Sequence, residues 1–115
     1  MFDSLKAMSQ LGPMMAKARE MQAKMAELQQ RLGALQATGT AGGGLVTATA
    51  NGRLELLDIV FAADAPIMDR AAMAELTLSA VNLAMANARQ IVQAEMRKIT
   101  GDVDLSAVQQ MLGGA

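Results

Sequence analysis

Pairs of carboxylates are the residues of this sequence that could serve acid–base catalysis or bind a metal ion. The close pairs are Asp64 with Asp69, Glu55 with Asp58, and Asp102 with Asp104. Asp64 and Asp69 lie around a proline, in a stretch typical of a turn that leads into a helix N-cap. The chain has no His and no Cys, so the usual proton shuttle, thiol nucleophile and commonest metal ligands are missing. We therefore predict no enzyme activity, no catalytic residue, no metal site, no cofactor and no small-molecule substrate.

Basic residues offer a different chemistry, the binding of phosphate groups. Lys17, Lys24 and Arg31 recur every seven residues, a spacing that places them on one flank of a helix. The segment from Ser4 to Ala37 holds five basic and two acidic residues, a net charge of +3, whereas the whole chain of 115 residues has a formal charge of -1. A local basic stripe of this kind could contact phosphates without reading bases.

The same charges have a simpler interpretation as ion pairs within the helix. Glu20 precedes Lys24, and Glu27 precedes Arg31, by four residues. This order stabilises an isolated helix by about 0.2–0.5 kcal/mol per pair. A solvated, self-paired face and a phosphate-binding stripe therefore both fit the charge pattern.

Further positive charge comes from Arg19, Arg97 and Lys98. The last two lie near the end of a second predicted helix, where basic residues complement the helix dipole in any case. Aromatic residues make up only 2% of the chain, so stacking on single-stranded bases is not expected. The candidate phosphate contacts are Lys17, Arg19, Lys24, Arg31, Arg97 and Lys98.

The basic stripe requires a long first helix, which we predict over residues 4–35. Its apolar residues follow steps of three and four, the spacing of a heptad seam: Leu11, Met14, Ala18, Met21, Met25, Leu28, Leu32 and Leu35. Pro13 fits near the start of the seam, where a missing N–H matters least. A helix of about 22 residues is about 33 Å long, while a domain of this size has a radius of gyration of about 13 Å. The helix is expected to project from its domain or lie on a partner; folding back on its own sheet is the alternative.

An antiparallel sheet is predicted over residues 36–62. The glycines at 42–44 are typical of a turn, and Asn51-Gly52 is a strong hairpin signal. One strand lies between these two turns, and an apolar return strand runs from Arg53 to about Ala62. Residues 36–40 could add a third, edge strand, because a two-stranded ribbon alone is marginally stable.

A second long helix is predicted over residues 69–100, with Asp69 as its N-cap. Its middle is apolar nearly all round, so it must be covered on more than one side, and we expect it to form a two-fold dimer interface. The candidate interface residues are Leu76, Ala80, Leu83, Ala84 and Asn87. Residues 101–115 carry a weak helical pattern and are expected to form a loosely attached tail of the single domain 1–115.

No feature of the sequence directs the chain to a membrane. The N-terminal residues lack the basic start and continuous apolar run of an export signal. No apolar stretch reaches the roughly 18 residues that a membrane-spanning helix requires. We expect a cytoplasmic protein.

Several motifs occur in an order that resembles the YbaB/EbfC family, over nearly the whole chain up to about Gly101. They are Met15-Ala-Lys-Ala-Arg-Glu-Met-Gln-Ala-Lys-Met25, Thr38-Gly-Thr-Ala-Gly-Gly-Gly-Leu-Val-Thr47, Asn51-Gly52 and Ala80-Val-Asn82. The glycine-rich run followed by Asn-Gly is the specific part. The resemblance implies a small bacterial nucleoid-associated protein that binds duplex DNA. It also implies a tweezer-like homodimer, with long helices extending from a core of helices and a three-stranded antiparallel sheet.

Residues and resemblance together predict an α+β homodimer in the nucleoid that binds duplex DNA through phosphates, with little sequence preference. The alternative is a homodimeric protein-interaction module whose Met-rich first helix binds a partner or self-assembles, because flexible Met-rich surfaces suit adaptable binding. Exposure of the seam distinguishes the two. Exposed Met14, Met21, Met25 and Leu28 would favour partner binding, whereas buried seam residues beside exposed bases would favour DNA.

Overall fold

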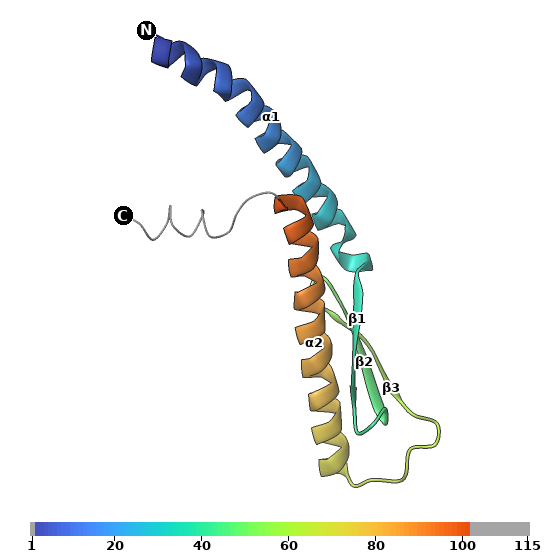
Figure 1. Cartoon of the computed structure of the whole chain (residues 1–115). Coiled ribbons are helices and arrows are strands. Elements are labelled where there is room, and N and C mark those ends of the chain that lie inside the picture. The colour runs from blue at the N-terminus through green and yellow to red at the C-terminus, as the bar shows by residue number, and fades with distance from the viewer. Residues whose placement is uncertain (1, 102–115) are drawn as a thin grey trace. The chain divides into compact units, whose positions relative to one another are not determined.

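The chain forms a long helix, a three-stranded sheet and a second long helix, in that order (Figure 1). This computed structural model describes residues 2–101, so the predicted tail lies outside the described residues apart from Gly101. The elements are α1 (Phe2–Arg31), a short 3-10 turn η1 (Leu32–Ala34), β1 (Gln36–Ala41), β2 (Val46–Asn51), β3 (Leu56–Phe61) and α2 (Arg70–Thr100). The predicted α+β class and element order are confirmed.

The chain divides into two compact units, residues 30–95 and residues 1–29 with 96–115. Each long helix contributes to both units. The single domain over 1–115 and the projection of the first helix stay predictions. Within residues 2–101, neither long helix has the apolar stretch needed to cross a membrane.

The sheet is an antiparallel meander with β2 in the centre. Side chains alternate between its two faces. Val46, Ala48 and Ala50 of β2 are fully buried on one face, where Ala48 is paired with Gly39 of β1 and Ile59 of β3. The other face carries threonines: Thr38, Thr40, Thr47 and Thr49. Strands β1 and β2 therefore present one face of small, buried residues to pack and one polar face to leave in water.

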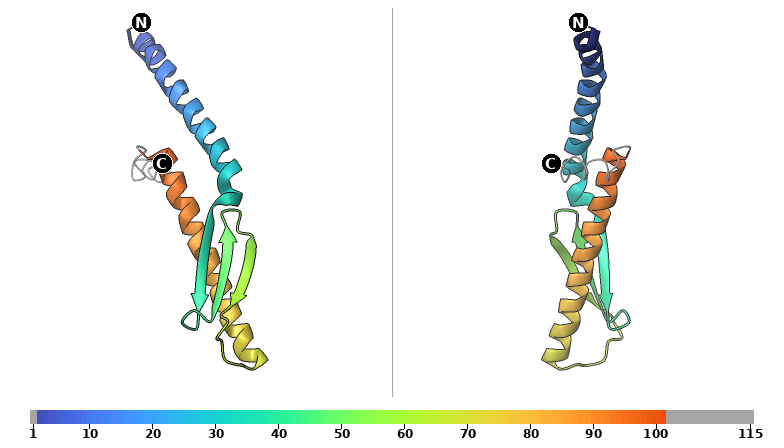
Figure 2. Two further views of the ribbon diagram at one scale, coloured as in Figure 1. Left: turned by 90° about the vertical axis from the view of Figure 1, so that its right-hand side faces the viewer. Right: turned by 60° about the vertical axis from the view of Figure 1, so that its left-hand side comes forward.

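Helix α2 covers the apolar face of this sheet (Figures 1 and 2). Ala80, Ala84 and Ala88 lie four residues apart and are buried against it. A Cβ at Gly39 would overlap the backbone nitrogen of Ala84 and the carbonyl oxygen of Ala80. Small side chains on both surfaces thus let helix and strand approach closely, and glycine is required at position 39.

The first helix ends at Arg31, whereas the prediction placed its end at residue 35. It begins at Phe2, well before Pro13. The loop after β2 explains the early end, because the Gly52 N–H donates to the carbonyl oxygens of Leu32 and Leu35, both at 2.9 Å. Leu35 is already extended, with ψ 119°. Pro13 consequently lies inside the helix, where it removes one N–H from the helical ladder.

The β2–β3 hairpin forms, but its turn is not the two-residue Asn-Gly turn that the sequence suggests. The Leu54 N–H donates to the Asn51 carbonyl at 3.0 Å, and the Asn51 N–H donates to Glu55 at 3.0 Å, so Gly52, Arg53 and Leu54 form a three-residue loop. Leu54 adopts φ 60°, the left-handed conformation that commonly closes such loops. The Asn51 side chain accepts from the Arg53 and Glu55 backbone N–H groups, each at 3.0 Å. Asn51 therefore acts through its side chain as well as its backbone.

The predicted start of the second helix is confirmed. The Asp69 carboxylate accepts a hydrogen bond from the Ala72 N–H at 2.7 Å, and the Met73 N–H donates to the Asp69 carbonyl at 3.1 Å. A side-chain oxygen at the N-cap satisfies one of the amide donors that the first turn leaves unpaired. Asp69 thus has a structural role.

Candidate nucleic-acid interface

Charge is distributed unequally between the two compact units. The described part of the first unit, residues 2–29 and 96–101, holds six basic and three acidic residues, a net charge of +3. Residues 30–95 hold four basic and six acidic residues, a net charge of -2. A near-neutral chain therefore carries a local positive region, as phosphate binding requires.

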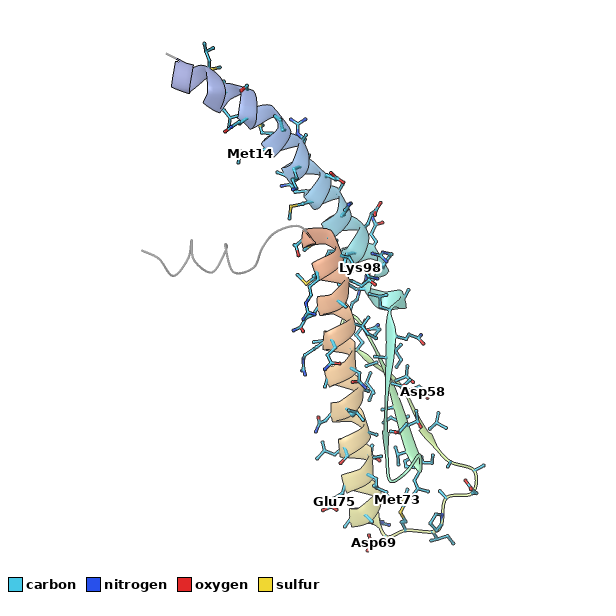
Figure 3. The ribbon with its side chains drawn as sticks, viewed as in Figure 1. Met14, Asp58, Asp69, Met73, Glu75 and Lys98 are labelled. Carbon is cyan, nitrogen blue, oxygen red and sulfur yellow. The ribbon has the colours of Figure 1, made fainter. Side chains whose placement is uncertain are left out.

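Three of the predicted phosphate contacts line one groove in this positive unit. Lys17 and Lys24 come from α1, and Lys98 comes from the last turn of α2, where Figure 3 labels it. The groove has a volume of about 220 Å³, and its other lining residues are Glu20, Met21, Ile99, Thr100 and Gly101. The sequence placed Lys17 and Lys24 on one flank but gave no signal that Lys98 would join them.

Of the two predicted intrahelical ion pairs, one forms as expected. Lys24 Nζ lies 3.2 Å from Glu20 Oε1, and both side chains are largely exposed. Arg31 instead reaches Glu95 of α2, with a nitrogen–oxygen distance of 3.5 Å. An exposed pair such as Lys24–Glu20 contributes about 0–1 kcal/mol, so Lys24 remains available to a polyanion, whereas Arg31 pairs with a carboxylate that is only 18% exposed.

The remaining basic candidates do not share one face. Arg19 follows Lys17 by two residues, which places it about 200° around the helix axis, away from the groove. Arg97 is exposed on α2 beside Lys98. The structure thus brings together Lys17, Lys24 and Lys98, and leaves Arg19 on the opposite side of α1.

The acidic candidates stand apart from one another. Figure 3 shows Asp58 on β3 and Asp69 at the first turn of α2, and Glu55 accepts a hydrogen bond from Asn51 Nδ2 at 3.0 Å. Asp102 and Asp104 lie outside the described residues. Within residues 2–101, no group of three or more His, Cys, Asp or Glu could hold a metal ion.

Most of the predicted dimer-interface residues are already packed within the chain. Ala80 and Ala84 are fully buried and Leu76 packs against the same core. Asn87 donates from Nδ2 to the carbonyl oxygen of Thr38 at 2.8 Å. Only Leu83 of the set is exposed. The chain's own sheet therefore covers the alanine face of α2, while Leu83 is left for contact with a second chain; the interface residues and homodimerisation stay predictions.

Sequence reasoning missed an apolar surface on β3. Leu56 and Phe61 pair with Ala50 and Val46, so they belong to the sheet face that packs on α2, yet 41% and 43% of their surfaces are exposed. Helix α2 therefore does not fully cover the third strand. The sequence did carry a signal for this surface, because β3 is apolar on both faces. An antiparallel strand that is buried on one face alternates apolar and polar residues.

The apolar seam of α1 is covered only near its end. Leu28 is 2% exposed, Met21 and Met25 are half-buried, and Met14 is 66% exposed (labelled in Figure 3). Leu5, Met8 and Leu11 are exposed as well. The seam is therefore neither fully exposed nor fully buried. Its last two turns are covered, and its first half is exposed beside exposed basic residues.

Comparison with known protein families identifies the family of this chain. Residues 8–103 match the model of the YbaB/EbfC DNA-binding family. The chain belongs to this family. Over 96 residues it is 38% identical to a nucleoid-associated protein of Chlorobaculum tepidum, an alignment that covers 83% of this chain and 85% of the relative. The YbaB/EbfC resemblance of the sequence motifs is therefore confirmed.

Other YbaB/EbfC relatives are similar over shorter stretches. A nucleoid-associated protein of Thermoanaerobacter pseudethanolicus is 45% identical over 67 residues, which cover 57% of this chain and 60% of the relative. The chain thus spans less than two thirds of that protein. A crystal structure of an uncharacterized Helicobacter pylori protein has the same fold, with a TM-score of 0.52 and 24% identity over 73% of this chain and 94% of the other.

Proposed function

We propose that the protein binds duplex DNA through phosphate contacts, with little sequence preference and an architectural, non-catalytic role in the nucleoid. The observation that carries this proposal is the groove of Lys17, Lys24 and Lys98 among residues 2–29 and 96–101, which have a net charge of +3. Lysine ammonium groups neutralise phosphates as point charges, and such contacts fix position without reading base edges. The family's DNA-binding description and the relatives named as nucleoid-associated support it.

Arg97 adds to this surface from the last turns of α2, and Arg31 contributes less because Glu95 neutralises part of its charge. Arg19 lies outside the proposed contact surface. Apart from Arg31, the negatively charged unit of residues 30–95 is not proposed to contact the duplex, because like charges repel.

Binding of labelled duplexes, followed by fluorescence anisotropy at low salt, tests the proposal. Several duplexes of unrelated sequence and equal length are expected to bind with affinities that agree within about threefold, because non-specific affinity comes from counterion release. Affinity is expected to fall steeply as salt rises. No binding at low salt, or strong dependence on sequence at constant length, would overturn the proposal.

We further propose that the homodimer forms through the uncovered side of β3. Leu56 and Phe61 line this side, and Ile59, Val81 and Met85 are partly buried against the core cluster. Burial of such apolar side chains is the main favourable term in stable dimers. The double variant Leu56→Asp/Phe61→Asp is expected to sediment as a monomer. Thr49→Asp, on the opposite face of the sheet, is expected to remain dimeric, and a dimeric Leu56/Phe61 variant would refute this interface.

A protein-interaction module is the second candidate function. The bare first half of the α1 seam supports it, because exposed Met and Leu side chains suit adaptable apolar contacts. If DNA is the ligand, changing Met8, Leu11 and Met14 to Ala does not weaken duplex binding, because the lysine groove is intact. Failure of the unmodified chain to bind any duplex at low salt would favour the protein-interaction module.

A further inference from the structure

The exposed half of the α1 seam ends where the groove begins. Leu5, Met8, Leu11 and Met14 are exposed, whereas Met21 is half-buried and lines the groove with Ile99 and Gly101. The last turn of α2 therefore covers the seam at Met21. Upstream of that point, nothing among residues 2–101 covers it.

The chain continues from this same point. Helix α2 ends at Thr100 and Gly101 lies in the groove, so the 14 residues from 102 to 115 leave the structure beside Lys17 and Met21. The last turn of α2 runs opposite in direction to α1 (Figures 1 and 2). A segment that kept this direction would pass along the exposed seam toward Leu5.

Length and pattern agree with this path. The exposed seam from Leu5 to Ala18 extends about 20 Å, and 14 residues of helix extend about 21 Å, at 1.5 Å per residue. Leu105, Val108 and Leu112 follow steps of three and four, the spacing that places apolar side chains on one helical face. The seam of α1 has the same steps.

The charges of residues 102–115 and of the groove also favour this path. Asp102 and Asp104 give residues 102–115 a net charge of -2, and they follow directly on a groove lined by Lys17, Lys24 and Lys98. Opposite charges attract across short distances in partly solvated sites. Glu20 already lines the groove and pairs with Lys24, and the two aspartates follow Gly101 by one and three residues.

We propose that residues 102–115 dock along the Leu5–Ala18 face of α1 in the same chain. Leu105, Val108 and Leu112 then cover Met14, Leu11 and Met8, and Asp102 and Asp104 lie beside Lys17 and Lys24. The aspartates compete with phosphates for the lysines, so the segment weakens duplex binding. This second part rests on the proposed function, whereas the docking does not.

Disulfide formation tests the docking, because the chain has no Cys of its own. The full-length variant Met14→Cys/Leu105→Cys is oxidised mildly and its products are separated on a non-reducing gel and mapped by mass spectrometry. An intrachain bond is expected at least about tenfold faster than in the matched control Ala16→Cys/Leu105→Cys, because Cα atoms more than 7 Å apart cannot be bridged. Ala16 lies about 200° from Met14 around α1.

Equal rates for the two variants would overturn the docking. A bond that links two chains in preference to an intrachain bond would also overturn it, because a second copy would then cover the face.

Duplex binding tests the competition. In the full chain, Asp102→Asn/Asp104→Asn is expected to bind a duplex about threefold more tightly at low salt, the effect of losing one or two exposed ion pairs. The control Asp58→Asn/Asp64→Asn removes the same charge from exposed positions in residues 30–95 and is expected to change affinity less. Equal gains in the two variants would overturn the competition. If the unmodified chain binds no duplex, the proposed function fails, and the disulfide result decides the docking alone.

Discussion

The middle of α2 and the first half of α1 are both apolar, but one is buried and the other is bare. Ala80, Ala84 and Ala88 of α2 have essentially no exposed surface, whereas Met8, Leu11 and Met14 of α1 are mostly exposed. The two helices have nearly equal lengths of 31 and 30 residues. Apolar content alone therefore does not distinguish a helix that forms the core from one that presents a surface.

The size of the side chains makes the difference. Alanines at four-residue spacing form a flat strip that fits against Gly39 and the small residues of β2, and close-packed contact gives many weak attractions. Methionine and leucine stand out from the helix and need a surface shaped to receive them. The contact between α2 and the sheet is thus built from small residues. The lysine groove lies next to the exposed seam of α1, which is built from large residues.

The contact between Gly39 and α2 should be the most sensitive point of the buried region. Gly39→Ala places a methyl group against the backbone of Ala80 and Ala84, and we expect a loss of unfolding free energy at the upper end of the usual 1–3 kcal/mol for overpacking, about 3 kcal/mol. Urea denaturation followed by far-UV circular dichroism measures it. Gly12→Ala serves as the control, because a Cβ there contacts nothing within 4 Å and alanine favours the helix by about 1 kcal/mol.

Substitutions at two seam residues of α1 should lower the free energy of unfolding by very different amounts. Leu28→Ala removes a side chain that is 2% exposed and is expected to cost about 2–4 kcal/mol of unfolding free energy. Met14→Ala removes one that is 66% exposed, and even with residues 102–115 docked over it the loss should be clearly smaller than for Leu28→Ala. Thermal or urea melts of the two variants compare them directly. Similar losses would mean that Met14 is as fully buried in solution as Leu28, which would contradict the comparison.

A substitution in the loop after β2 should cause a smaller loss of unfolding free energy. Asn51 is buried, and its side-chain oxygen accepts from two backbone N–H groups. Asn51→Ala leaves these donors without a partner, and we expect a loss of about 1–3 kcal/mol. Asn82→Ala, at an exposed position of α2, is the matched control and should be nearly neutral. Backbone hydrogen exchange at Arg53 and Glu55 would report the loss locally.

The sequence predicted the regular elements well because local signals determine them. Glycines at 42–44, the Asn51-Gly52 pair and the Asp69 cap marked the turns and the helix start within one or two residues. Contacts between distant segments had no such signal. The end of α1 depends on the Gly52 N–H, Arg31 pairs with Glu95, and Lys98 meets Lys17 only through the fold.

The dimer prediction shows the same limit. An apolar helix must be covered, but its pattern does not tell whether its own sheet or a second chain covers it. The sheet covers the alanines of α2, whereas Leu78 and Leu83 of the same helix and Leu56 and Phe61 of β3 stay exposed.

The salt dependence of duplex binding tests the central claim most directly. We compare the unmodified chain with Lys17→Ala/Lys24→Ala/Lys98→Ala and with the control Arg19→Ala/Arg70→Ala/Arg89→Ala, which removes equal charge outside the groove. Each lost phosphate contact should make the slope of log Kobs against log salt shallower by about 0.9. The account predicts a slope shallower by about 2–3 units for the groove variant and a nearly unchanged slope for the control. Equal slopes for all three proteins would contradict it.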